Sequence, residues 1–298
     1  MQLSNFRNND SARIDVNCLD RVETKPIYYL DEDEEGNPAF LRMKNHCATY
    51  NATTGKLIAP ATKSYAVLQH SDAFSRILDV VERILGQNSD AKFYVEGLGN
   101  RARLWILVPS ARDNSNLIAG IRITNSYDMS VSLQGDLVVW YVPGDFPIII
   151  PDVRHLGLYL ALPHRAGAFK NLEERVQDYL QNALSGETKR AIEAAIDKAR
   201  GISLVFNSDE EKEILLKKVL VGKKHASKLT PLVPDRISRW DLFLLITDYV
   251  NKESFTALMR DIVTQKAMAF LRKSGPGWDN FYESTSNRAN TRGDFPAQ

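Results

Sequence analysis

The sequence has few cysteines and lacks long apolar runs, and both absences exclude classes of protein. Only Cys18 and Cys47 occur among the 298 residues, and they form neither a CxxC pair nor the Cys/His spacing of a zinc site. We expect reduced thiols, with a disulfide between them as the alternative. The N-terminus holds no apolar run of a signal peptide, and no segment approaches the ~20 apolar residues that cross a bilayer. The sequence predicts a soluble protein of the cytoplasm with no membrane partner.

An excess of one charge is also missing, because 38 basic and 37 acidic side chains leave a formal net charge of +1. No global field therefore attracts or repels nucleic acid, and only the local distribution of charge can do so. Acids gather near the N-terminus, most densely in residues 31–35. The simplest interpretation is an acidic turn that joins a hairpin of Ile27–Leu30 and Ala39–Met43. The alternative is an acidic arm that competes with nucleic acid for a basic groove.

Sequence motifs of several enzyme classes are absent. There is no Walker loop, and Gly97-Leu98-Gly99 lacks the third glycine of a dinucleotide fold. No HExxH or GxSxG motif occurs, so the sequence indicates neither a zinc site of that type nor a serine hydrolase. His155 and His164 could approach Asp152 and hold a divalent metal. We expect ordinary histidines instead, and predict no metal and no cofactor.

Acidic residues near predicted turns leave one enzymatic alternative open. Acids at the ends of adjacent strands can hold the two metal ions of a nuclease. The candidates are Asp128, Asp136, Asp145 and Asp152. Hydrogen bonding within turns explains Asp128 and Asp136 without catalysis. Whether the protein is an enzyme is therefore open, with a non-enzymatic protein favoured.

Residues 64–165 carry the pattern of an antiparallel sheet backed by a helix. Tyr65–His70 is predicted to form a strand, and Ser71 or Asp72 to cap the helix that follows. Apolar residues recur at three-four spacing from Phe74 to Leu85, which predicts one buried helix face. Short strands follow at residues 91–96, 102–108, 117–124 and 131–142. Their connections are too short for crossover helices, so the strands should form an antiparallel meander.

The chain after residue 165 is predicted to be helical. Helical periodicity occurs in residues 169–184, 187–200, 208–221, 238–250 and 254–273. Ser208 with Glu211, and Ser185 with Thr188, are start signals of two of these helices. Residues 222–234 lie between two of them and are typical of a basic connection interrupted by proline.

The expected fold is therefore α+β, a helix-backed antiparallel β-meander followed by a helical C-terminal region. The expected parts are an acidic N-terminal arm with a hairpin (1–63), the α+β core (64–165), the helical region (166–274) and a flexible tail (275–298). The tail is polar but contains Trp278, Phe281, Tyr282 and Phe295. Such a segment cannot form its own core. We expect its rings to dock on this chain, on a second copy, or on a replication or recombination partner.

Basic and aromatic residues suggest a surface that binds nucleic acid. The candidates on the meander are Lys92, Tyr94, Arg101, Arg103, Trp105 and Arg122. Residues two apart on a strand point to the same face, so Arg101, Arg103 and Trp105 lie together. The cations are assigned to phosphates, and Tyr94 and Trp105, if they are exposed, to stacking on bases. A solvated face with a buried Trp105 is the alternative. A second basic group comprises Lys217, Lys218, Lys223, Lys224 and Lys228. It either extends the same binding groove or only makes the end of a helix soluble.

Three segments, Ser64–Gln69, Gly99–Trp105 and Thr124–Ser130, resemble successive landmarks of the phage/plasmid-like family known as domain of unknown function 932. Ser238–Val250 and Ala267–Leu271 look like its C-terminal helical landmarks, so the likeness spans roughly residues 64–273. The family usually continues with an Arg-Val-Val-Cys-containing strand, where this chain has an unrelated strand and a proline-rich loop. The family has no settled activity, so the resemblance implies a mobile-element setting more than a mechanism.

The order of strand, helix and meander also looks like the core of single-strand annealing proteins, which bind exposed DNA strands in a groove of an oligomeric ring. The leading hypothesis is a non-enzymatic protein of a phage or plasmid that binds or anneals single-stranded DNA, as a homo-oligomer. One alternative is a structural protein, or one that binds a host factor, in which the acidic arm is the partner surface. The other is the metal-dependent nuclease.

Overall fold

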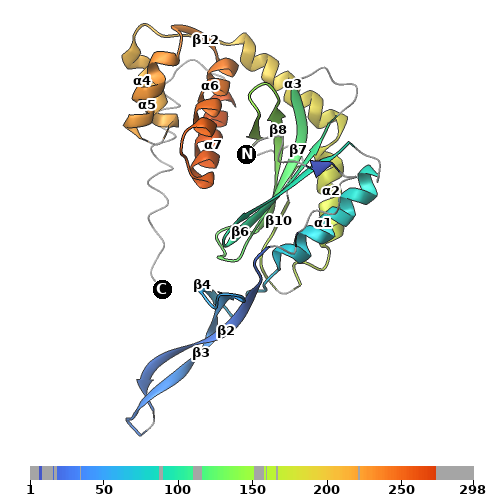
Figure 1. Cartoon of the computed structure of the whole chain (residues 1–298), viewed down its shortest axis with the longest axis vertical. Helices are drawn as coiled ribbons and strands as arrows, with labels where there is room; N and C mark the ends of the chain where they lie inside the picture. The colour runs from blue at the N-terminus through green and yellow to red at the C-terminus, as the bar shows by residue number, and fades with distance from the viewer. Residues whose placement is uncertain are drawn as a thin grey trace. The chain divides into compact units, whose positions relative to one another are not determined.

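The computed structural model describes residues 7–8, 16, 19–33, 35–86, 90–109, 116–150, 158, 160–165, 167–220 and 222–272. The chain divides into two compact units (Figure 1). The first unit comprises Met1–Pro147 and Asp152–Thr188, and the second comprises Ile148–Pro151 and Lys189–Gln298. Each unit is described by itself.

An antiparallel sheet forms the centre of the first unit and confirms the predicted meander. Its central strands pair in chain order: β5 (Lys92–Leu98), β6 (Arg101–Val108), β7 (Leu117–Ser126) and β8 (Leu133–Tyr141). Three shorter strands pair at its two sides: β1 (Arg7–Asn8) with β5, and β9 (Phe146–Ile150) and β10 (Leu160–Leu162) with β8. Gly99 makes the turn between β5 and β6 at a positive φ of 65°, a conformation that costs glycine little.

Helices α1 (His70–Leu85) and α2 (Leu172–Ala183) lie on the same side of this sheet (Figure 1). The predicted apolar face of α1 is buried, with Phe74 and Ile77 fully inaccessible. Gly135 of β8 allows a close approach of α2, because a Cβ atom there would lie 2.7 Å from the Tyr179 ring. The helix-backed sheet therefore has one face that packs on helices and a second face that points away from them.

The predicted strand at Tyr65–His70 is wrong. Tyr65 forms only an isolated bridge with Arg165, and α1 already begins at His70. The predicted caps Ser71 and Asp72 are also wrong, because they lie within the helix and Gln69 occupies the N-cap position. The Gln69 amide instead donates to the Val22 carbonyl at 2.6 Å and accepts from the Val22 N–H at 3.0 Å. This side chain binds a neighbouring strand, and its backbone forms no sheet ladder.

A separate three-stranded sheet precedes α1. Its strands are β2 (Val22–Glu32), β3 (Pro38–Asn51) and β4 (Leu57–Thr62), in that spatial order. The predicted hairpin is present, since Tyr28 pairs with Arg42 and Leu30 with Phe40. β4 pairs only with His46–Tyr50, near the base of β3. The outer part of the β2–β3 hairpin is therefore two-stranded and projects from the sheet (Figure 1).

The second unit is mainly helical, as the periodicity predicts. Its helices are α4 (Asp209–Val219), α5 (Lys223–Leu229), the 3-10 turn η4 (Thr230–Leu232), α6 (Arg239–Lys252) and α7 (Ala257–Arg272). α3 (Gly186–Gly201) starts in the first unit, and a two-stranded ribbon joins β11 (Ser203–Val205) to β12 (Arg236–Ser238). The start signals at Ser208 and Ser185 are confirmed, because their hydroxyls accept from the backbone N–H groups of Glu211 and Thr188.

Helix α5 corrects the prediction of an irregular basic connection over residues 222–234. Ala226 and Leu229 of α5 are buried, so burial of an apolar face stabilises a helix too short to be recognised by periodicity. None of the helices that the structure describes combines the length and apolarity needed to cross a bilayer. Cys18, Asp152, His155 and the tail 275–298 lie outside the described residues.

Candidate functional site

The sheet face that points away from α1 and α2 carries most of the predicted binding residues. The pairing of β5 to β8 places Tyr94, Trp105, Arg122 and Asp136 side by side across the four strands. The Arg122 guanidinium lies 5.4 Å from the centre of the Trp105 ring and donates to Asp136 at 2.6 and 3.0 Å. This row is a cross-strand ladder of two aromatic side chains, one cation and one carboxylate.

Burial of this row contradicts part of the predicted binding surface. Trp105 and Arg122 are each 3% exposed, and Arg103 is 5% exposed with its guanidinium 3.6 Å from Glu96. A base cannot stack on a buried ring, and a buried arginine that has a carboxylate partner does not offer its charge to a phosphate. These three side chains therefore do not form an exposed surface in the structure, and Trp105 is buried, as in the alternative interpretation. A contact of these residues with DNA stays a prediction.

The other predicted residues are more accessible. Lys92, Tyr94 and Arg101 are half-buried on the same sheet face, and burial raises the pKa of Tyr94. The second basic group lies in the second unit, on α4 and α5. Lys217 pairs with Glu213 at 3.1 Å and Lys228 with Glu253 at 3.3 Å, whereas Lys218 is half-buried. Lys223 and Lys224 are exposed, and neither has an ion pair within the described ranges.

Of the predicted nuclease acids, the three that the structure describes lie in ordinary turn and ladder positions. Asp136 pairs with Arg122, and the Trp140 indole donates to Asp145 at 3.2 Å. Asp128 accepts from the Ser130 N–H at 3.0 Å, which closes an Asx turn. No group of three or more metal-ligating side chains is found in the part of the chain that the structure describes. The structure thus gives the nuclease alternative no site among these residues.

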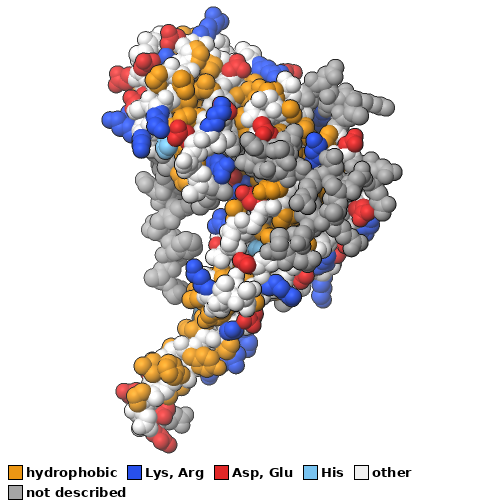
Figure 2. Space-filling model, viewed as in Figure 1, with side chains coloured by type: hydrophobic (Ala, Val, Ile, Leu, Met, Phe, Trp, Pro, Cys, Tyr) orange, Lys and Arg blue, Asp and Glu red, His pale blue; other side chains and the backbone are white. Residues whose placement is uncertain are grey.

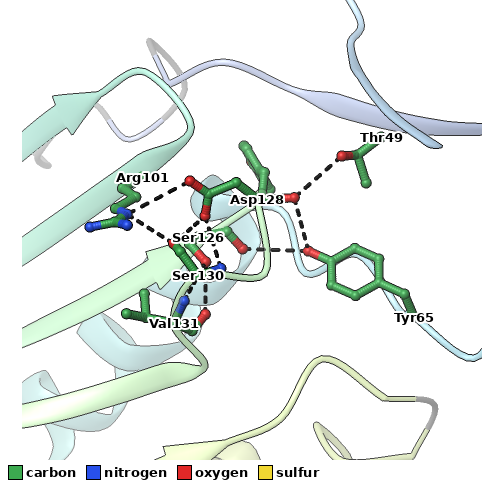
Figure 3. A network of polar contacts seen from close by, with 8 residues as sticks. Thr49, Tyr65, Arg101, Ser126, Asp128, Ser130 and Val131 are labelled. Carbon is green, nitrogen blue, oxygen red and sulfur yellow. Dashed lines mark hydrogen bonds and ion pairs between the residues drawn. The ribbon is translucent and has the colours of Figure 1, made fainter. Parts of the chain in front are cut away.

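The three motifs that resemble the phage/plasmid-like family meet in one polar network at an end of the meander (Figure 3). Arg101 donates to the Ser130 hydroxyl at 2.9 Å and lies 3.8 Å from Asp128. The Ser126 hydroxyl donates to the Val131 carbonyl at 2.7 Å. The Tyr65 hydroxyl lies 3.4 Å from the Ser126 carbonyl that it donates to. Segments about sixty residues apart in the sequence thus hold one turn in a fixed conformation.

Tyr127 is the buried centre of this region. Its hydroxyl accepts from the His70 N–H at 2.8 Å and donates to the Asp20 carbonyl at 2.9 Å. The His70 ring stacks on the Tyr127 ring with centroids 3.7 Å apart, and Asn125 lies 3.0 Å from the same imidazole. Burial lowers the pKa of His70 to about 3 and raises the pKa of Tyr127 to about 12. Both rings are therefore neutral at physiological pH.

A cavity of about 450 Å³ lies beside this turn. Its walls are Thr62, Ser64, Tyr65, Met129, Val131, Ser132, Pro163, His164 and Arg165. The volume is in the range of small-ligand sites. Tyr65 and His164 stack with centroids 5.3 Å apart, while the edge of His164 contacts Phe169. The cavity thus offers aromatic rings, hydroxyl groups and one guanidinium within the same small space.

Two side chains give this cavity its electrostatic character. His164 is 8% exposed, and neither of its ring nitrogens has a hydrogen-bond partner among the described residues. Burial lowers its pKa, an effect that the nearby Ala66 backbone only partly opposes. Arg165 is exposed and has no carboxylate partner within the same residues. The cavity therefore combines a neutral imidazole with a cation that is available to an anionic ligand.

No protein-family model, curated protein or solved structure matches the chain. The candidate site therefore rests on geometry. Sequence reasoning found Tyr65 through the family resemblance. It weighed His164 only as a metal ligand, a role that it did not favour, and it assigned no role to Arg165. Both follow Pro163 at the end of a short strand, and no local pattern marks them as part of a site. Tertiary contacts bring them to Tyr65: the bridge between Tyr65 and Arg165, the stacking of the Tyr65 and His164 rings, and the hydrogen bond from the Ala66 N–H to the His164 carbonyl.

Proposed function

We propose that this protein binds or anneals single-stranded DNA, as a non-enzymatic protein of a phage or plasmid. The observation that carries the proposal is the cavity between Tyr65 and Arg165. Single-stranded nucleic acids are held by aromatic stacking together with cationic contacts to phosphates. The half-buried Tyr65 ring, which rests on the buried His164 ring, and the exposed Arg165 supply both kinds of group at one place.

The position of the cavity also supports a nucleic-acid strand over a free small molecule. Lys63 is exposed and stands between two cavity residues, Thr62 and Ser64. Arg165 and Lys63 thus place two cations at its border, enough to contact more than one phosphate. The half-buried cations Lys92 and Arg101 on the meander are candidates for further contacts.

Fluorescence anisotropy of a labelled single-stranded oligonucleotide tests this proposal. We expect binding at low salt that weakens steeply as salt rises, because each neutralised phosphate of a single strand contributes a logarithmic slope of about −0.7. Arg165→Ala should weaken binding and reduce this slope. Arg190→Ala, which removes an exposed arginine of α3, should leave binding unchanged. Absence of binding at low salt would contradict the proposal.

An interaction protein of a mobile element is the second candidate. The observation in its favour is the β2–β3 hairpin, which exposes Phe40 to 75% and Leu30 to 65%. Exposed apolar side chains of this size indicate contact with another protein. The two candidates are compatible, because the hairpin and the cavity are different surfaces.

A further inference from the structure

The outer β2–β3 hairpin has apolar side chains on both of its faces. Cross-strand pairing puts Tyr28, Leu30 and Phe40 on one face, and all three are exposed. Tyr29 and Leu41 pair on the other face, where Tyr29 is 44% exposed. An antiparallel hairpin of an isolated protein normally keeps one face polar. Figure 2 shows hydrophobic side chains along this hairpin. Such a two-stranded element is stable in water only when it packs on something else.

The tip of the hairpin is acidic, and its acids are not neutralised. Asp31, Glu32, Asp33 and Glu35 are all exposed, and none of them has an ion pair in the described part of the chain. Asp33 instead accepts from the N–H groups of Glu35 and Asn37, which fixes the turn. A surface that receives this hairpin must therefore be apolar with basic residues beside it.

The same chain carries such a surface on α5 and η4. Lys223 and Lys224 begin α5, are exposed, and have no ion pair among the described residues. Leu232 ends η4, directly after α5, and is 60% exposed. We call Lys223–Leu232 the α5–η4 surface. It combines two exposed lysines, of which Lys223 also acts on the nearby Glu213, with the exposed apolar side chain of Leu232. These features are complementary to the acidic, apolar hairpin.

We propose that the β2–β3 hairpin of one copy docks on the α5–η4 surface of a second copy. The contact joins two different surfaces, so each copy keeps one free hairpin and one free α5–η4 surface. Repetition of such a heterologous contact builds a closed ring or an open filament. The acid–lysine pairs fix the orientation, and burial of the apolar faces supplies the stabilisation. Lys223 and Lys224 are thereby assigned to self-association, which differs from the DNA contact predicted from the sequence.

Light scattering coupled to size-exclusion chromatography tests this contact without DNA. The wild-type chain should form oligomers whose mass increases with protein concentration and decreases at high salt, because screening weakens the charge pairs. A tip variant (Asp31→Lys, Glu32→Lys and Glu35→Lys) and a surface variant (Lys223→Glu with Lys224→Glu) should each be monomeric. Circular dichroism should match the wild type for both, since all five side chains are exposed.

Mixing the two variants tests whether the hairpin of a second copy, and no other partner, binds the α5–η4 surface. In the mixture, the basic tip of the tip variant meets the acidic α5–η4 surface of the surface variant. The basic α5–η4 surface of the tip variant meets the acidic tip of the surface variant. We expect the mixture to recover the wild-type mass. A mixture that stays monomeric, or a wild-type chain that is monomeric at all concentrations, would overturn the proposal. Assembly of the surface variant like the wild type would also overturn it, since that result indicates tip-to-tip association. These readouts contain no DNA, so they do not depend on the proposed function.

Discussion

The imidazole of His70 lies face to face with the phenol ring of Tyr127, with ring centroids 3.7 Å apart. The two residues belong to the first turn of α1 and to the turn after β7. Their contact fixes the end of the meander that carries the cavity. Because the Tyr127 hydroxyl also donates to Asp20, the segment before β2 is held at the same point.

Removal of the Tyr127 hydroxyl should destabilise the protein. Tyr127→Phe keeps the ring but leaves the buried His70 N–H and the Asp20 carbonyl without this partner. An unsatisfied buried polar group costs about 1–3 kcal/mol, so we expect a loss of that size in urea unfolding. Tyr141→Phe is the control, because its hydroxyl has no hydrogen bond among the described residues. Equal stability of both variants would show that the Tyr127 hydrogen bonds contribute little.

Acidification should destabilise the protein through His70. Its pKa is about 3 in the folded protein and about 6.5 in the unfolded chain, so the unfolded chain binds the additional proton between these values. The stabilisation is complete above pH 6.5 and is lost as the pH falls toward 3. Between pH 7 and pH 5 the loss from this residue is about 2 kcal/mol. His70→Gln should therefore show a smaller pH dependence of its unfolding free energy. Identical pH dependence in the two proteins would contradict the neutral, buried imidazole.

Arg122 should contribute to stability more than to DNA binding. Arg122→Ala leaves the Asp136 carboxylate without its buried partner, and loss of such a partner costs about 3–5 kcal/mol. We expect this decrease of the unfolding free energy in chemical unfolding experiments. Arg83→Ala is the control, because Arg83 is exposed and has no ion pair among the described residues; its guanidinium donates to the Asp79 carbonyl of its own helix. Unchanged stability together with weaker oligonucleotide binding would instead support the role predicted from the sequence.

The close approach of α2 to the sheet depends on Gly135. In Gly135→Ala the new methyl group would lie 2.7 Å from the Tyr179 ring, so the helix or the ring must move. Overpacking of this kind costs about 1–3 kcal/mol, which thermal unfolding can detect. Gly201→Ala adds the same atom where nothing lies within 4 Å. We expect no loss of stability in Gly201→Ala. A comparable loss of stability in Gly135→Ala and Gly201→Ala would contradict the packing of α2 on β8.

The sequence predicted the elements better than the surfaces. Alternation identified β5 to β8, and three-four spacing identified α1, because both patterns follow directly from burial on one side. It failed at Tyr65–His70, where the Gln69 side chain takes hydrogen bonds that a strand would form with its backbone. The sequence did not show that Trp105 and Arg122 are buried, because alternation shows which residues share a face and not whether that face is covered. His164 and Arg165 carry no local signal, since their position against Tyr65 is set by tertiary contacts.

The most direct test of the central claim is photo-crosslinking with a single-stranded oligonucleotide that contains thiothymidine, followed by mass spectrometry of the peptides. If the cavity holds a nucleotide, the crosslinked peptides should contain Tyr65 or the segment Pro163–Arg165, and unlabelled oligonucleotide should compete. Arg165→Ala should reduce the yield, whereas Arg190→Ala should not. Crosslinks confined to Lys223 and Lys224, or a yield that competitor does not change, would contradict the account.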